Sequence, residues 1–174
     1  MRALCLAAVL AIPCGSALAD FHSRAGDVLA TAMPVAALGG ALLAGDKEGA
    51  WQFTETLVAS LVVTQALKKT VHERRPDGKD TEAFASGHAT RAFAPAAYWH
   101  RRYGLETAWP AYVAATYVGY TRVRSDHHYW HNIAISAGLS VGIAYWRVQP
   151  LGRDVAIGPR LDGNGVGVQL SARW

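Results

Sequence analysis

The stretch FASGHATRAF, residues 84–93, places a serine, a glycine and a histidine directly before an alanine-rich segment with helical spacing. The start of a helix carries backbone N–H groups without intrahelical partners, together with the positive end of the helix dipole. Ser86 and Gly87 would let an anion approach both, with His88 beside it. The same residues would also form an ordinary helix cap, because serine is a preferred N-cap residue. The stretch therefore predicts a helix that begins near residue 87 and leaves its role to the rest of the chain.

The first nineteen residues have the pattern of a secretory signal peptide. They contain Arg2, an apolar run and a closing Ala-Leu-Ala, which predicts cleavage before Asp20 and export to the bacterial periplasm or to a membrane that faces it. The two cysteines, Cys5 and Cys14, both lie in this segment, so residues 20–174 carry no cysteine chemistry. Cys14 could instead mark a lipoprotein anchor, although Pro13 stands where a small residue is expected.

Charge and hydropathy favour an anionic partner at a membrane surface. The net charge of +4 becomes +3 once Arg2 leaves with the signal, which suits anionic substrates or lipid headgroups and does not require nucleic acid. The uncharged run Val28–Gly45 is just long enough to span a bilayer, but Pro34 interrupts it. We expect a buried core helix there, with a spanning helix as the alternative. The sequence does not predict an oligomeric state.

Apolar residues at helical spacing predict an all-α bundle of about five helices over residues 20–152. Arg75 should end the second helix, because the residue before Pro76 is pushed out of the helical region. Residues 153–174 contain two alternating segments around a DGNG turn, which predicts a short C-terminal β-hairpin. The helices are expected at 26–44, 49–74, 87–102, 107–121 and 128–147.

Two further polar clusters accompany the first. In KKTVHERRP, Lys68 and Arg75 are seven residues apart, which would place both on one face of a continuing helix, although a solvated basic face is the simpler interpretation of this cluster alone. In YTRVRSDHHYWHN, His128 follows Arg122 by six residues, and Asn132 lies one helical turn after His128. At that spacing Asn132 is expected to hydrogen-bond the imidazole of His128 and to orient it.

Taken together, the three clusters resemble the type 2 phosphatidic acid phosphatase superfamily, which includes lipid phosphatases, bacterial nonspecific acid phosphatases and vanadium haloperoxidases. The pattern of that family is Lys-x6-Arg-Pro, then Pro-Ser-Gly-His, then Ser-Arg-x5-His-x3-Asp. This chain has the same order and the same internal spacings, with Ala85 for the proline of the second motif, Thr121 for the serine of the third and Asn132 for its final aspartate. The motifs cover residues 68–132, and agreement at about seven fixed offsets is more specific than any single cluster.

The resemblance implies a phosphatase that needs no metal and no other cofactor. Its substrate would be a phosphomonoester or pyrophosphate, on a phosphorylated lipid or a small phosphoester. His128 would attack phosphorus to give a phosphohistidine, and His88 would protonate the leaving group. The phosphate-binding residues implied are Lys68, Arg75, Ser86, Gly87 and Arg122, whose cations would neutralise the phosphoryl charge.

Asn132 is the departure with the largest expected effect. Aspartate would hold the proton of His128 on the remote ring nitrogen, whereas asparagine keeps an acceptor and loses the charge. Asn132→Asp is therefore expected to raise turnover about tenfold or more, equivalent to about 1.4 kcal/mol of barrier. Asp126 could substitute as the orienting group, but it would face away from His128 within a helix.

Three alternatives stay open from the sequence. Asn132 could disable attack and leave a catalytically weak protein that binds phosphate or anionic lipid. His128 could coordinate vanadium in a haloperoxidase, although the chain is short for that branch of the superfamily. His127 and His131 are four residues apart and could form half of a zinc site, but no third ligand stands at a recognisable spacing.

Overall fold

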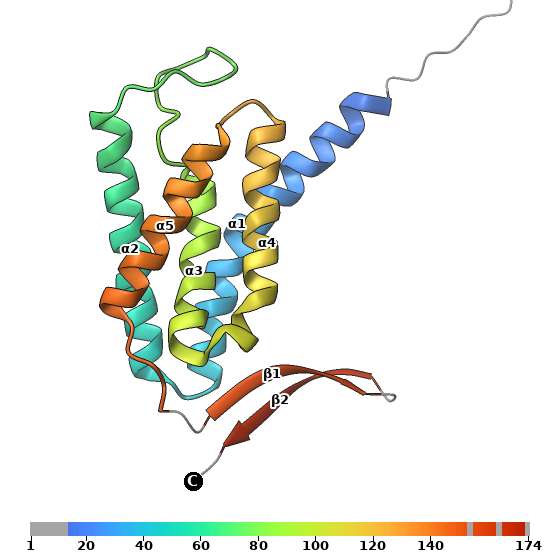
Figure 1. Cartoon of the computed structure of the whole chain (residues 1–174). Coiled ribbons are helices and arrows are strands. Elements are labelled where there is room, and N and C mark those ends of the chain that lie inside the picture. The colour runs from blue at the N-terminus through green and yellow to red at the C-terminus, as the bar shows by residue number, and fades with distance from the viewer. Residues whose placement is uncertain (1–13, 153–154, 163–164, 173–174) are drawn as a thin grey trace, which may run out of the picture.

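The computed structural model describes residues 14–152, 155–162 and 165–172, with side chains over 21–152. In this part of the chain five α-helices form a bundle, which confirms the predicted all-α class (Figure 1). Most of the predicted signal segment, 1–19, lies outside the described residues, so its cleavage stays a prediction. The helices are α1 (Cys14–Leu43), α2 (Lys47–Thr70), α3 (Gly87–Tyr103), α4 (Leu105–Arg124) and α5 (Trp130–Arg147).

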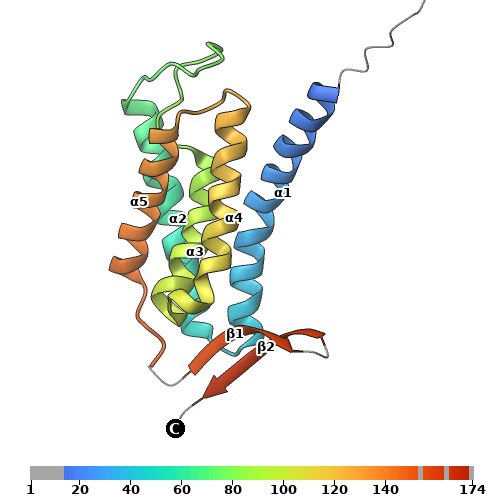
Figure 2. The ribbon, with the colours of Figure 1, turned by 45° about the vertical axis from the view of Figure 1, so that its right-hand side comes forward.

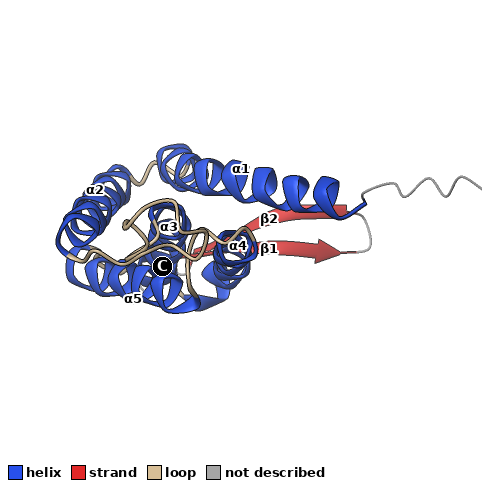
Figure 3. Cartoon of the chain, turned by 90° about the horizontal axis from the view of Figure 1, so that it is seen from above, coloured by secondary structure: helices blue, strands red, loops and turns tan. Residues whose placement is uncertain are grey.

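Helix α3 lies in the middle of the bundle and packs against each of the other four helices (Figure 3). Its inward positions are small, and Ala89, Ala92 and Ala96 are fully buried. Helices α1 and α4 also approach closely, since a Cβ added to Gly26 would lie 2.1 Å from Thr121 Oγ1. Only glycine fits at that contact. Small residues therefore set the spacing of the bundle.

The end of α2 differs from the prediction. The helix ends at Thr70 rather than at 74, because Val71 is extended and the chain beyond it pairs with the segment before α3. The carbonyl of Glu73 accepts the N–H of Ala83 at 3.0 Å in this pairing. Arg75 consequently lies in a loop, and the expectation that it shares a helix face with Lys68 is wrong.

Helix α1 is covered by the protein on one side only. Ala30 and Ala37 are buried against the bundle, whereas Val28 and Val35 are exposed. Among the described residues, α1 contains the one helical segment long and apolar enough to cross a membrane, Phe21–Leu43, and 28% of its most apolar window is buried. The prediction of a buried core helix therefore holds for one face of α1, and the other face is left apolar and uncovered.

Beyond the helices, the strands β1 (Val155–Asp162) and β2 (Gly165–Ala172) pair antiparallel with Val155 opposite Ala172. They lie at the end of the bundle opposite the loop between α2 and α3 (Figure 2). The predicted hairpin over 153–174 falls on these strands, but part of its DGNG turn lies outside the described residues. The boundary between a helical domain and a separate hairpin stays a prediction.

A buried ion pair joins the start of α2 to the end of α3. Asp46 caps α2 by accepting the N–H of Gly49 at 2.8 Å, and its carboxylate also receives Nε of Arg102 and the hydroxyl of Tyr103, each at 2.8 Å. The side chains of Asp46 and Arg102 are 8% and 4% exposed. Burial alone would raise the pKa of Asp46, but the hydrogen bonds from Arg102, Gly49 and Tyr103 outweigh it and lower that pKa below 3.8. The pair is therefore ionised at neutral pH.

Replacing Arg102 by methionine should strongly destabilise the fold, because it leaves the buried carboxylate of Asp46 without its charged partner. We expect the free energy of unfolding at pH 7 to fall by about 3 kcal/mol or more, measured by urea denaturation with far-UV circular dichroism. The penalty should shrink as the pH falls through the ordinary pKa of aspartate, since a protonated Asp46 needs no cation. The exposed Arg124 of α4 provides the control, and Arg124→Met should change stability by less than about 0.5 kcal/mol. Equal losses in both variants would contradict the role given to the ion pair.

Candidate active site

Helices α2 and α4 end, and α3 begins, at the same end of the bundle (Figure 1). A polar cavity of about 470 Å³ lies at this end. Helix α1, the end of α2 with its following loop, the start of α3 and the loop between α4 and α5 all contribute to it. The cavity collects every predicted site residue except Ser86 and Asn132. The residues that line it are Ser23, Asp27, Gln65, Lys68, Arg75, Gly87, His88, Arg91, Arg122, His127 and His128.

His128 lies in the loop before α5 and is oriented by a backbone carbonyl. Its Nδ1 is 2.9 Å from the carbonyl oxygen of Ala83, and the side chain is buried. Because a carbonyl oxygen can only accept a hydrogen bond, Nδ1 carries the proton and Nε2 keeps its lone pair in the neutral ring. Burial lowers the pKa of His128 to about 4; the bond to Ala83 opposes this shift, while Lys68 and Arg75 add to it. At neutral pH His128 is therefore an unprotonated base or nucleophile at Nε2.

The start of α3 uses Ser86 as a cap and presents the two residues after it to the cavity. Ser86 Oγ accepts the N–H of Ala89 at 3.4 Å, and the N–H of Ser86 donates to Ser136 Oγ at 2.8 Å. Ser86 is fully buried and is not among the residues that line the cavity, so its contact with phosphate stays a prediction. Gly87 and His88 line the cavity at the positive end of the helix.

Three of the cationic side chains that line the same cavity come from three different segments. Lys68, in the last turn of α2, is buried and donates to the carbonyl of Glu82 at 3.0 Å; burial and the nearby Arg75 lower its pKa. Arg75 forms an ion pair with Asp80 at 2.8 Å in the loop after α2. Arg122, near the end of α4, is also buried. Such a group matches the charge and the several oxygens of a phosphate.

Asn132 does not orient His128, contrary to the prediction. The helix begins at Trp130, so His128 lies before α5 and the expected helical spacing is absent. Asn132 Oδ1 accepts the N–H of Tyr129 at 2.8 Å, and Asn132 Nδ2 donates to Glu73 Oε2 at 2.7 Å. Asn132 therefore caps α5 and ties it to the loop after α2, while the Ala83 carbonyl performs the orienting role.

The sequence also raised Asp126 as an orienting group and His127 with His131 as half of a zinc site, and these three side chains lie in different surroundings. Asp126 is exposed in a left-handed conformation with φ of 56°, and its backbone carbonyl accepts the N–H of Asp77 at 3.0 Å. His131 Nε2 lies 2.6 Å from Glu73 Oε1, whereas His127 lines the cavity. Within the described ranges, no group of three histidine, cysteine or carboxylate side chains could hold a metal ion.

The sequence interpretation missed the part of the site that α1 supplies. Asp27 lies 3.0 Å from Arg122 and 3.2 Å from His88, and the carbonyl of Ser23 accepts Arg122 at 2.8 Å. Nothing in the spacing of α1 indicates these contacts, because they join residues between 61 and 99 positions apart. Arg91 was detectable, since it lies three residues after His88 on the same face of α3.

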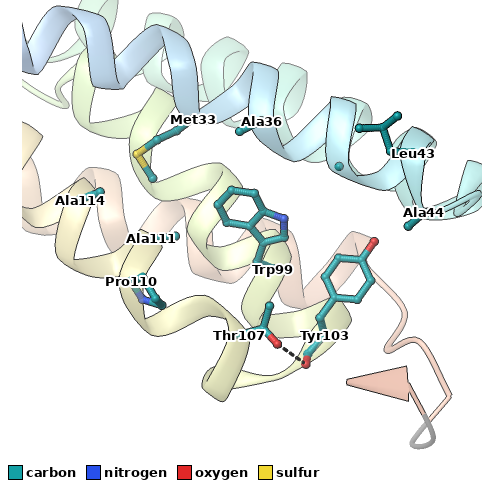
Figure 4. Close-up of a pocket in the computed structure, with 11 residues that line it drawn as sticks. Met33, Ala36, Leu43, Ala44, Trp99, Tyr103, Thr107, Pro110, Ala111 and Ala114 are labelled. Carbon is teal, nitrogen blue, oxygen red and sulfur yellow. Dashed lines mark hydrogen bonds between the residues drawn. The ribbon is translucent and has the colours of Figure 1, made fainter. Parts of the chain in front are cut away.

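A larger cavity of about 630 Å³ lies away from these residues, between α1, α3 and α4 (Figure 4). Figure 4 shows Met33 of α1, Trp99 of α3 and Ala111 of α4 converging on it, and its lining is almost wholly apolar. It holds none of the cations or histidines described above. The smaller polar cavity is therefore the candidate active site despite its lesser volume.

Asn132→Asp should not raise turnover, which reverses the expectation from the sequence. The new carboxylate would stand 2.7 Å from that of Glu73, where two negative charges repel. We expect the free energy of unfolding at pH 8 to fall by about 1 kcal/mol or more, with the loss diminishing at pH 4, where carboxylates take up protons. Adding Glu73→Gln should restore most of the stability, because the amide can donate to the new carboxylate. A tenfold gain in turnover from Asn132→Asp alone would show that residue 132 does act on His128.

Comparison with known proteins places one curated relative beside this chain. Over 86 residues this chain is 33% identical to a lipid A 1-phosphatase of Porphyromonas gingivalis. The alignment covers 46% of this chain and 19% of that protein. The alignable stretch is thus about a fifth of the length of the relative. No protein-family model matches the chain. No solved structure matches it either.

Proposed function

We propose that the chain is a metal-independent phosphatase that hydrolyses a phosphomonoester or pyrophosphate, on a lipid, through a phosphohistidine intermediate. The observation that carries the proposal is the state of His128. Its Nδ1 proton is held by the Ala83 carbonyl, which leaves Nε2 free beside Lys68, Arg75 and Arg122. A neutral imidazole next to three cations suits attack on an anionic phosphorus centre.

The proposed reaction has two displacement steps. In the first, the Nε2 lone pair of His128 forms a bond to phosphorus as the bond from phosphorus to the ester oxygen breaks. His88 gives its proton to the departing oxygen, which leaves as an alcohol from a phosphomonoester or as a phosphate from a pyrophosphate. In the second, neutral His88 takes a proton from a water molecule whose oxygen attacks phosphorus. The bond to His128 then breaks, and inorganic phosphate leaves with both histidines restored.

Two features support a lipid as the substrate. A shallow apolar hollow of about 500 Å³ shares Asp27 with the polar cavity and is otherwise lined by Val28, Thr31, Ala32 and Val35 of α1. A phosphate bound in the cavity would have an apolar surface next to it for a hydrocarbon chain. The name of the relative, lipid A 1-phosphatase, points to the same class of substrate.

The binding-only alternative rested on the replacement of aspartate by Asn132. The hydrogen bond from His128 to the Ala83 carbonyl supplies the tautomer control for which that aspartate was expected. A missing charge at residue 132 therefore gives no reason to expect the wrong tautomer. This favours turnover over simple phosphate binding.

The purified chain should release phosphate from both a lipid phosphate, such as phosphatidic acid in detergent micelles, and a small aryl phosphate in the presence of EDTA. Vanadate should inhibit, because its five-coordinate form resembles the in-line transition state. His128→Ala should reduce kcat about a thousandfold or more, while the control His72→Ala, at an exposed position, should leave it unchanged. A requirement for added zinc or magnesium would refute the metal-independent mechanism. Phosphate binding without release from any substrate would refute the enzyme and support the binding protein.

The pH dependence of kcat/KM should be bell-shaped with an acidic optimum. On the acid side the rate should rise as His128 loses its proton, at a pKa of about 4. On the alkaline side it should fall as His88 loses the proton it must donate; burial and Arg122 lower the pKa of His88 below 6.5. Initial rates on the aryl phosphate across pH 3 to about 9 test this order of the two histidines. An optimum above about pH 8 would contradict it.

A further inference from the structure

Helix α1 brings a carboxylate to the two groups that would act on the phosphate and its leaving oxygen. Asp27 Oδ1 is 3.0 Å from one terminal nitrogen of Arg122 and 3.2 Å from Nε2 of His88. The other terminal nitrogen of Arg122 donates to the carbonyl of Ser23 at 2.8 Å, one helical turn before Asp27. Arg122 is therefore bound to both the first and the last residue of one turn of α1, Ser23 and Asp27.

Packing holds this turn of α1 in place. Gly26, the residue before Asp27, faces Thr121, the residue before Arg122. A Cβ added to Gly26 would lie 2.1 Å from Thr121 Oγ1 and would collide with it. Both Gly26 and Thr121 are buried. The position of Asp27 thus follows from a close contact between two helices, and its carboxylate reaches His88 from a fixed backbone.

We propose that Asp27 is a positioning residue that holds Arg122 and the general acid His88 in their working orientation and stabilises the imidazolium form of His88. This inference rests on the proposed phosphatase function. The imidazolium has two N–H groups, of which Nε2–H donates to Asp27 and Nδ1–H is left for the leaving oxygen. When Nδ1 gives up its proton, the neutral ring keeps Nε2–H on Asp27 and so keeps its orientation. The arrangement has the logic of a carboxylate that orients a histidine from its remote nitrogen.

The charges around His88 explain why such a carboxylate matters. The groups that face it from the packed elements are Asp27 of α1, Arg91 of α3, Arg122 of α4 and His127 of the loop before α5. Among these described groups, Asp27 is the anion. Burial, Arg122, Arg91 and His127 all lower the pKa of His88, and Asp27 alone of the four charged neighbours raises it. Without Asp27, His88 would face only cationic or neutral groups and would lose its proton at lower pH.

The test measures the titration of His88 directly and through catalysis. Histidine Cε1 proton resonances of the full chain, with His88 assigned from the His88→Asn variant, would be followed against pH in the wild type and in Asp27→Asn. We expect the midpoint for His88 to fall by about half a unit to one unit in Asp27→Asn, and the alkaline limb of kcat/KM to move down by the same amount. Asp27→Glu should restore most of both shifts, because it restores the charge.

Asp126→Asn is the matched control. It removes the same charge from an exposed loop residue at the same end of the bundle, and asparagine tolerates the left-handed conformation at that position. The His88 midpoint and the alkaline limb should stay in place in this variant. A similar shift in both variants would show a general effect of net charge and would overturn the specific role of Asp27.

Other outcomes separate this inference from the proposed function. An unchanged His88 midpoint in Asp27→Asn would overturn the inference even if the enzyme is active. A lower KM in Asp27→Asn, with no shift of the His88 midpoint or of the alkaline limb, would also overturn the inference. Asp27 would then act as an internal anion that competes with phosphate. If the wild type releases phosphate from no substrate, the proposed function fails, while the resonance titration still decides whether Asp27 stabilises protonated His88.

Discussion

The site depends on how closely four helices can approach a central fifth, α3. Helix α3 contacts all the others, and half of its buried residues are alanine, so each neighbour can come near its backbone. The contact of Gly26 with Thr121 applies the same constraint to α1 and α4. Because of this spacing, the start of α3, the end of α4 and the middle of α1 meet at one end of the bundle. Larger side chains at these contacts would separate Asp27, His88 and Arg122.

The loops at this end of the bundle position the remaining groups of the site. The segment after α2 leaves the helix early and pairs with the segment before α3, and this pairing positions the carbonyl of Ala83. That carbonyl then holds His128, which precedes α5. Asn132 and Glu73 tie the start of α5 to the same loop. A set of backbone and amide contacts thus provides the orientation that a single aspartate was expected to provide.

The proposed mechanism gives the two histidines different roles, and their electrostatic surroundings differ in the same sense. His128 is buried near Lys68 and Arg75, so its neutral form is favoured and its Nε2 is free to act as a nucleophile. His88 is more exposed and has a carboxylate within 3.2 Å, which favours the protonated form needed by an acid. Two groups with opposite tasks in one cavity require such unlike surroundings. The excess of cations that would bind phosphate also disfavours a protonated His88, and Asp27 offsets part of that effect.

The helical class, the approximate positions of the helices and several residues that line the polar cavity could be predicted from the sequence. The spacing of apolar residues indicates which face of a helix is covered. Charged or small residues at fixed offsets depart from that spacing, so Lys68, His88, Arg122 and His128 could be predicted as candidate site residues. Cleavage of the signal segment and a boundary between the helical domain and a separate C-terminal hairpin stay predictions. The positions of Arg75 in a loop and of Asn132 as the cap of α5 became visible in the folded chain alone. The same is true of the contacts of His128 with the Ala83 carbonyl and of His88 with Asp27. The physical reason is that a backbone carbonyl has no side-chain signature, and that a contact between α1 and α4 depends on packing across about a hundred residues of chain rather than on any local pattern.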